Sequence, residues 1–128
     1  MSSPPKPLVY VVDDDAAVLG SLRFLLETDG FTVRTFRNGT ALLNAVHASK
    51  ADCYVIDYKM PDINGVDLAG RLRKSDGSVP IIIITGYPDE NISARAAAAG
   101  VKDVILKPLL DENLLKQIRH AIADKPPN

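Results

Sequence analysis

Continuous apolar runs alternate with amphipathic stretches along the chain. The runs Leu8–Val12 and Ile81–Ile84 are apolar at every position, which is typical of strands buried on both faces of a parallel sheet. The stretches between such runs repeat apolar residues at helical spacing, as Val18, Leu22 and Leu26 do. The pattern predicts strands at 8–12, 31–36, 53–56, 80–84 and 101–106, the last mainly from Asp103, and helices at 16–29, 38–46, 65–74, 89–99 and 111–122, with Asn38, Asp89 and Asp111 as caps.

The strict alternation of strand and helix predicts an α/β fold with a doubly wound, five-stranded parallel sheet covered on both faces. For five such units the common strand order is 2-1-3-4-5, as in flavodoxin-like folds. The 128 residues are enough for one domain, which we expect over 8–123. Residues 1–7 are polar and proline-rich, so we expect a disordered tail there and a short tail at 124–128.

Polar residues stand directly after four of the predicted strands. Asp13, Asp14 and Asp15 follow the first strand, Asp57 the third, Thr85 ends the fourth and Lys107 follows the fifth. In the order 2-1-3-4-5, the first and third strands flank the point where the direction of winding reverses, and ligands bind there at the carboxyl ends of the strands. We therefore expect these side chains to meet in one crevice.

Several carboxylates in one crevice repel each other, so they need raised pKa values or a bound cation. Carboxylate oxygens suit Mg²⁺, with Mn²⁺ as a substitute, better than Zn²⁺, whose nitrogen and sulfur ligands are absent from these loops. Lys107 and Thr85 can hold phosphoryl oxygens beside such a metal, and Asp57 then has the position of a nucleophile. The predicted product is an aspartyl phosphate.

Composition narrows the partners and the location. The 15 Lys and Arg residues nearly balance the 16 Asp and Glu residues, so we expect no DNA binding by this chain itself. The longest aliphatic run, Ile81–Ile84, is far shorter than the roughly 20 residues that cross a bilayer, and we expect no membrane contact. Cys53 is the only cysteine, and the first residues lack the pattern of a secretory signal. A cytoplasmic protein is expected.

On the helix at 65–74, Asp67 and Arg71 are spaced to form an ion pair.

With these motifs in order, the chain resembles the receiver domain of two-component response regulators from Leu8 to Ala123. The matching segments are Val11–Asp15, Asp57–Gly65, Ile84–Gly86 and Leu106–Pro108. Each segment alone is unspecific, but their joint order and spacing are highly specific.

The resemblance implies that Asp57 accepts a phosphoryl group from the phosphohistidine of a sensor histidine kinase. It also implies a metal site made by Asp13, Asp14, Asp57 and the backbone carbonyl of Lys59, with Thr85 and Lys107 gripping the phosphoryl group. In this family the grip remodels the face formed by the helix at 89–99, the strand at 101–106 and the last helix. The resemblance further implies a cis peptide bond before Pro108.

Three residues are expected to affect how the domain switches and how long the phosphoryl group lasts. Many members of the family carry an aromatic residue three positions before the lysine, where this chain has Val104, and Tyr87 is the candidate for a substitute movement. Lys59 stands two residues after Asp57 and can reach into the crevice. Because Lys59 and Tyr87 flank the path of an attacking water, we expect slow self-dephosphorylation and no other enzymatic activity.

The favoured interpretation is a single-domain response regulator that signals through a phosphorylation-controlled protein-binding surface. Its expected partners are a sensor kinase and a downstream target, with a homodimer through the remodelled face as an option. The alternatives are a relay that passes phosphate to a histidine phosphotransfer protein, and a phosphorylation-independent interaction module. A hydrolase of the haloacid-dehalogenase type needs an acid where Lys59 stands, and a flavodoxin-like FMN module needs hydroxyls and amides in place of Asp13–Asp15.

Overall fold

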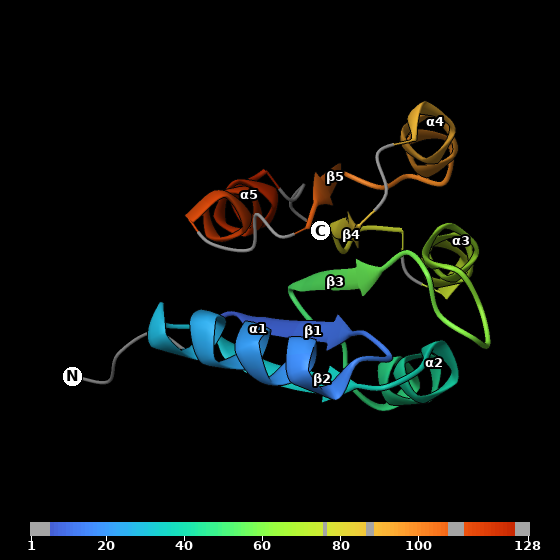
Figure 1. The fold of residues 1–128 in the computed structure, drawn as a ribbon. Helices are drawn as coiled ribbons and strands as arrows, with labels where there is room; N and C mark the ends of the chain where they lie inside the picture. The colour runs from blue at the N-terminus through green and yellow to red at the C-terminus, as the bar shows by residue number, and fades with distance from the viewer. Residues whose placement is uncertain (1–5, 76, 87–88, 108–111, 125–128) are drawn as a thin grey trace.

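The computed structural model describes residues 6–75, 77–86, 89–107 and 112–124. Ten elements alternate in these ranges, as the sequence pattern predicts (Figure 1). They are β1 (Leu8–Val12), α1 (Ala16–Thr28), β2 (Thr32–Phe36), α2 (Gly39–Ala48), β3 (Cys53–Asp57), α3 (Gly65–Ser75), β4 (Ile81–Thr85), α4 (Glu90–Ala98), β5 (Asp103–Leu106) and α5 (Glu112–Ala123).

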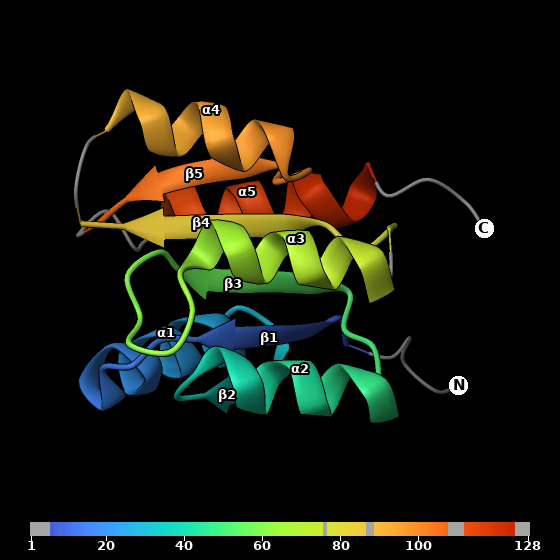
Figure 2. The ribbon, with the colours of Figure 1, turned by 90° about the vertical axis from the view of Figure 1, so that its right-hand side faces the viewer.

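The five strands form one parallel sheet in the order β2-β1-β3-β4-β5, which confirms the predicted topology. Helices α2, α3 and α4 lie in front of the sheet in Figure 2, and α1 and α5 lie behind it. Strands β1 and β3 are neighbours in the sheet although α1, β2 and α2 separate them in the chain. This crossover brings the loops after β1 and β3 together at the carboxyl end of the sheet.

The central strands β1, β3 and β4 are largely apolar because both faces of the sheet are covered there, whereas the edge strands β2 and β5 also carry polar residues such as Arg34 and Asp103. On β3, Tyr54 and Ile56 pack toward α2, α3 and α4, whereas Cys53 and Val55 pack toward α1 and α5. All four residues are at most 1% exposed. Burying one such aliphatic side chain contributes roughly 1.5–3 kcal/mol, so the central strands hold the two layers together.

The ends of the helices follow the predicted capping residues where the structure describes them. Asn38 caps α2, Asp89 caps α4, and Gly30 and Gly100 adopt the positive φ angles that end α1 and α4. The predicted cap Asp111 lies outside the described residues. No helix in the described ranges has the length and apolarity needed to span a bilayer.

One local prediction is wrong. The side chain of Asp67 accepts a hydrogen bond from the side-chain amide of Asn64, and its backbone N–H donates to the Asn64 side-chain oxygen, each at 2.9 Å. This reciprocal cap of α3 takes the place of the expected ion pair, and within the described residues Arg71 has no carboxylate partner. Near a helix start, a cap competes successfully with a surface ion pair.

Candidate functional site

A crevice of about 630 Å³ opens at the carboxyl end of the sheet, where the loops after β1, β3, β4 and β5 meet. Every predicted site residue that the structure describes, apart from Val104, lines it. Met60 and Pro61 line it as well, although the sequence pattern does not single them out as site residues. Met60 is 8% exposed and gives the crevice an apolar wall; its place directly after the polar Lys59 offered no signal of this. The lining residues are Asp13, Asp14, Asp15, Asp57, Lys59, Met60, Pro61, Thr85, Gly86 and Lys107.

Asp57 is the last residue of β3 rather than the first residue after it. It is paired in register with Ile84 and is only 5% exposed. The loop that follows is closed tightly, because the Gly65 N–H donates to the Tyr58 carbonyl at 2.7 Å. A Cβ atom at Gly65 would stand 2.9 Å from the Asp57 carbonyl oxygen, so a glycine is required there. The backbone of Asp57 is therefore held by the sheet on one side and lies against the start of α3 on the other.

Three carboxylates gather in the crevice. One oxygen each from Asp13, Asp14 and Asp57 lies within 4.8 Å of the others. Asp13 is fully buried, whereas Asp14 is exposed. The third acid of the β1–α1 loop, Asp15, turns away and accepts hydrogen bonds from the backbone N–H groups of Ala17 and Val18 at the start of α1, at 2.9 and 3.4 Å.

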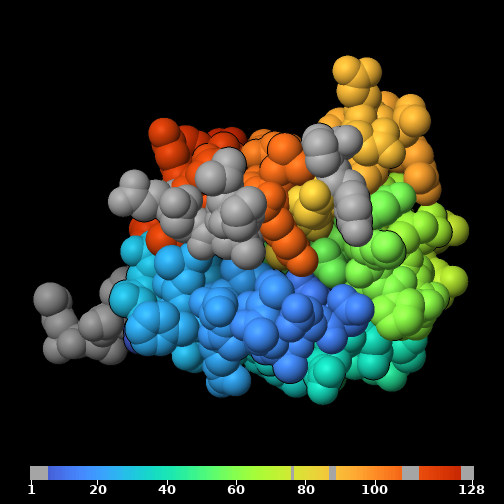
Figure 3. All heavy atoms as spheres, viewed as in Figure 1, coloured from blue at the N-terminus to red at the C-terminus, as the bar shows by residue number. Residues whose placement is uncertain are grey.

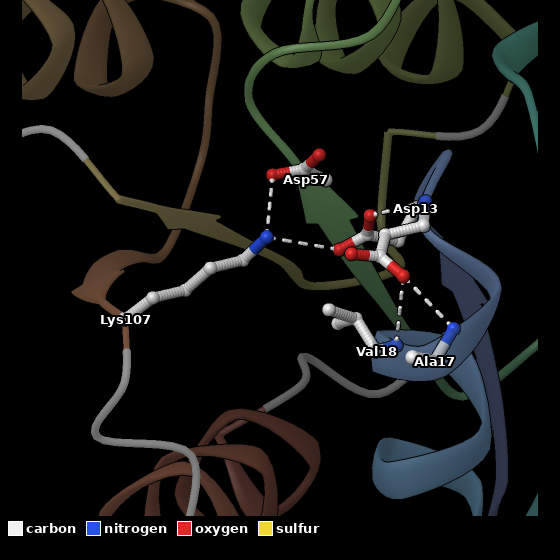
Figure 4. A network of polar contacts seen from close by, with 6 residues as sticks. Asp13, Ala17, Val18, Asp57 and Lys107 are labelled. Atoms are coloured by element: carbon white, nitrogen blue, oxygen red, sulfur yellow. Dashed lines mark hydrogen bonds and ion pairs between the residues drawn. The ribbon is translucent and has the colours of Figure 1, made fainter.

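Lys107 reaches between two of these acids, as Figure 4 shows. Its Nζ lies 3.1 Å from Asp13 Oδ2 and 3.2 Å from Asp57 Oδ1. Its backbone N–H donates to the Thr85 carbonyl at 2.7 Å, which fixes the end of β5 beside the end of β4. Burial lowers the pKa of Lys107, but the bonds and the charges of Asp13 and Asp57 outweigh burial and leave this pKa raised. The lysine is therefore firmly protonated.

The single positive charge of Lys107 does not neutralise the three carboxylates of the crevice. Burial, followed by repulsion from Asp13, raises the pKa of Asp57 to about 6, although Lys107 acts in the opposite direction. Asp14 adds a smaller repulsion. Additional positive charge in the crevice would stabilise the ionised form of a carboxylate whose pKa is raised in this way.

The donor atoms fit a hard divalent cation. Asp13, Asp14 and Asp57 supply only oxygen ligands, close together and with excess negative charge, as Mg²⁺ requires. His47 and His120 lie on α2 and α5, away from the crevice, so nitrogen ligands do not contribute. These three residues can hold the ion, and the carbonyl of Lys59 remains the predicted fourth ligand.

The remaining predicted residues are distributed as follows. Thr85 ends β4, is 2% exposed and lines the crevice beside Lys107. Lys59 is exposed at the rim. Val104 is partly buried and packs into the core layer beneath α2, α3 and α4, outside the crevice. Tyr87 and Pro108 lie outside the described residues, so the predicted aromatic substitute and the predicted cis bond stay predictions.

Comparison with known proteins agrees with this geometry. A family model described as the response regulator receiver domain matches residues 9–119. Among curated proteins, the transcriptional regulatory protein FixJ of Bradyrhizobium diazoefficiens is 37% identical over 119 residues, which cover 93% of this chain and 58% of that protein. The response regulator protein TmoT of Ectopseudomonas mendocina is 37% identical over 115 residues, which cover 90% of this chain and 52% of TmoT.

Solved structures show the same fold. A CheY-like receiver domain protein from Methanospirillum hungatei superposes with a TM-score of 0.90 at 27% identity, covering 94% of this chain and 96% of that one. Full-length FixJ from B. japonicum superposes with a TM-score of 0.88 at 36% identity, covering 97% of this chain and 61% of FixJ. The chain thus spans a little over half of the length of the first curated relatives it matches.

Proposed function

The chain belongs to the response regulator receiver domain family, and from that premise we propose that Asp57 accepts a phosphoryl group from a sensor histidine kinase in a Mg²⁺-dependent reaction. Members of this family are phosphoacceptor modules rather than catalytic enzymes, and their partners are sensor histidine kinases. The observation that carries the assignment to Asp57 is its carboxylate, buried at the end of β3, 3.2 Å from Lys107 and in one cluster with Asp13 and Asp14.

The reaction exchanges one bond to phosphorus for another. A carboxylate oxygen of Asp57 attacks the phosphorus atom, the P–O bond forms, and the P–N bond to the kinase histidine breaks. The histidine leaves with the electron pair of that bond and takes up a proton from solvent. Phosphoryl transfer needs mainly positioning and stabilisation of the equatorial oxygens.

The residues of the crevice divide this work. Lys107 places its positive charge between Asp13 and Asp57 and can turn toward the phosphoryl oxygens, and the Thr85 hydroxyl can donate a hydrogen bond to the same group. Asp13, Asp14, Asp57 and the Lys59 carbonyl would hold Mg²⁺, or Mn²⁺ in its place, which supplies positive charge for the phosphoryl oxygens when bound. With a pKa of about 6, Asp57 is mainly ionised at neutral pH, as a nucleophile must be.

The output of the phosphorylated form is a protein contact. We propose the face of α4, β5 and α5 as the surface that responds, with a downstream protein, a histidine phosphotransfer protein or a second copy of the chain as its partner, in the cytoplasm. Transcriptional regulation is named for FixJ, a protein of which this chain covers 58%. The proposal for this chain therefore concerns the receiver domain and its phosphorylation.

Intact mass spectrometry tests the assignment. The protein is incubated with Mg²⁺ and acetyl phosphate, beside Asp57→Asn, Asp15→Asn and a sample with chelator. We expect one added phosphoryl group in the wild type and in Asp15→Asn, and none in Asp57→Asn or with chelator. Asp15→Asn is the matched control, since it removes a carboxylate of the same crevice while asparagine preserves the helix cap. An adduct on Asp57→Asn would refute the assignment.

The decay of the adduct tests the predicted role of Lys59. Because Lys59 stands at the rim of the crevice, we expect its replacement by alanine to speed the loss of phosphate by opening the path of water. The comparison is made after the phosphodonor is removed, with Mg²⁺ held constant. A wild-type adduct that lasts only seconds would contradict the predicted slow self-dephosphorylation, and a Lys59→Ala adduct with an unchanged lifetime would contradict the role of Lys59 in it.

A further inference from the structure

A second hollow, of about 720 Å³, lies between α3 and α4 on the outer side of the sheet layer. The two helices lie next to each other in front of the sheet in Figure 2. In the space-filling view, the atoms of α4 stand at one corner of the molecule, above those of α3 (Figure 3). Val66 and Gly70 of α3 and Ala98 and Ala99 at the end of α4 line the hollow. Side chains this small let the backbone of a bound segment approach closely. We refer to this hollow as the α3–α4 groove.

The walls of the α3–α4 groove are tied together. From α3, the guanidinium of Arg73 donates to the Gly100 carbonyl at the end of α4, at 2.8 and 3.2 Å, and to the Val79 carbonyl at 2.5 Å. Gly100 has a φ of +84°, and a Cβ atom there would stand 2.8 Å from Arg73 Nε. The groove is therefore formed before any partner arrives, which lowers the cost of binding.

Two acids at one end of the groove are already engaged. The carboxylate of Asp62 accepts hydrogen bonds from the backbone N–H groups of Gly39 and Thr40 and from the Thr40 hydroxyl, at 3.1–3.4 Å. Asp67 is engaged by the side-chain amide of Asn64. Both carboxylates thus accept hydrogen bonds from groups at the starts of helices and form no ion pair with the described cations of the groove.

Three cations line the same groove: Arg71 and Lys74 from α3 and Arg95 from α4. All three are exposed, and across the described ranges no carboxylate forms an ion pair with any of them. Other exposed cations behave differently, as the pairs Arg23–Glu27 and Lys102–Asp124 show. The groove therefore carries positive charge beside an apolar floor.

The groove is also in contact with the candidate phosphorylation site. Arg95 donates to the Tyr58 hydroxyl at 3.4 Å, and Tyr58 directly follows Asp57. The backbone of Tyr58 is bonded on both sides, since its N–H donates to the Ile84 carbonyl at 2.9 Å and its carbonyl accepts from Gly65. These hydrogen bonds link the residue after Asp57 to a cation of the groove.

We propose that the α3–α4 groove binds an acidic, amphipathic helix of a partner protein, and that phosphorylation of Asp57 changes its affinity through Tyr58 and Arg95. The second part rests on the proposed function. The small apolar floor fits the apolar face of a helix, and the cations fit acidic residues on its flank. A nucleic acid fits less well, because its phosphates repeat along its whole length and some would lie beside Asp62 and Asp67, whereas a helix can place its acidic residues beside the cations alone.

The binding test uses a defined probe. A fluorescein-labelled helical peptide of about 15 residues carries leucine and alanine on one face and glutamate on its flanks; its counterpart carries lysine in place of glutamate. Fluorescence anisotropy gives Kd for the unphosphorylated wild type, for the double variant Arg71→Gln/Lys74→Gln, and for Arg37→Gln/Lys116→Gln. This last variant is the matched control, since it removes two exposed cations outside the groove.

We expect the glutamate peptide to bind the wild type and the control equally and the groove variant roughly tenfold more weakly, as expected from losing two ion pairs at the rim of an interface. Amide chemical shifts should change on α3 and α4. Failure of the glutamate peptide to bind, equal loss in the control, or equal binding of the lysine peptide overturns the proposal. Tighter binding of a single-stranded oligonucleotide than of the peptide overturns it in favour of nucleic acid.

A second arm tests the coupling. Phosphorylation of the wild type should change the Kd of the glutamate peptide roughly fivefold or more, and Tyr58→Phe should take up phosphate by mass yet show no such change. A wild-type adduct without any change in Kd refutes the coupling while Asp57 stands as phosphoacceptor. Absence of any adduct refutes the proposed function. The peptide binding measured on the unphosphorylated protein then still tests whether the α3–α4 groove is a binding site.

Discussion

The interior of the sheet and the crevice at its carboxyl end are made from adjacent residues of the same strands, yet they have opposite effects on stability. Ile56 is fully buried among apolar side chains, and the next residue, Asp57, is a nearly buried carboxylate beside Asp13. Burial stabilises the first and raises the pKa of the second. The reactive charge thus lies where strand pairing ends, and burial of the apolar strands offsets the free energy that burying this charge costs.

The largest effect on stability is expected in the interior. Ile83 is fully buried on β4 and pairs in register with Ile56 and Val104. Ile83→Ala should lower the free energy of unfolding by about 3–4 kcal/mol, because it removes buried methyl groups and leaves a cavity. Urea denaturation measures the loss. The phosphoryl adduct per folded molecule should stay unchanged; a folded variant without an adduct would break the proposed separation between interior and crevice.

Replacing Asp57 in the crevice should raise the free energy of unfolding instead of lowering it. Asp57 has a pKa of about 6 when folded and 3.8 as its ordinary value, so between these values the folded state binds more protons than the unfolded state. Stability contributed by protonated Asp57 is therefore present below pH 4 and is lost as pH rises through 6. Without metal, Asp57→Asn should gain at most about 3 kcal/mol at pH 8 and lose this part of the pH dependence.

The measurement is chemical denaturation of the wild type and Asp57→Asn from pH 4 to pH 8 with chelator present. Added Mg²⁺ should stabilise the wild type more than the variant, because the ion offsets the repulsion among Asp13, Asp14 and Asp57. Equal stability of both proteins at pH 8, or a wild type that gains stability from pH 4 to pH 6 relative to Asp57→Asn, would contradict the raised pKa.

The sequence predicts the fold well because its signals are local and regular. Strands that are apolar throughout, such as Leu8–Val12, indicate a sheet with two covered faces, and the alternation with helices leaves few topologies. The meeting of Asp13, Asp57, Thr85 and Lys107 follows from that topology, since each stands at the carboxyl end of a strand.

Contacts that side chains make with distant elements leave no such local signal. The bond from Arg95 to Tyr58, the clamp of Arg73 on Gly100 and the engagement of Asp62 at the start of α2 depend on how helices pack. The expected pairing of Asp67 with Arg71 fails for a related reason, because the side-chain amide of Asn64 competes for the same carboxylate. The spacing of residues in the sequence shows which contacts are possible, and the packing of the helices determines which of them form.

The smallest effect is expected at Asp15, which belongs to the acidic loop by sequence but to the scaffold by contacts. Its carboxylate accepts from the backbone N–H groups of Ala17 and Val18 and lies outside the three-acid cluster. Asp15→Ala should therefore cost about 1 kcal/mol through the lost cap, whereas Asp15→Asn should cost only a few tenths. Both should acquire the phosphoryl adduct. Loss of the adduct in both folded variants would place Asp15 in the crevice chemistry, and the division between scaffold and crevice would then begin one residue later.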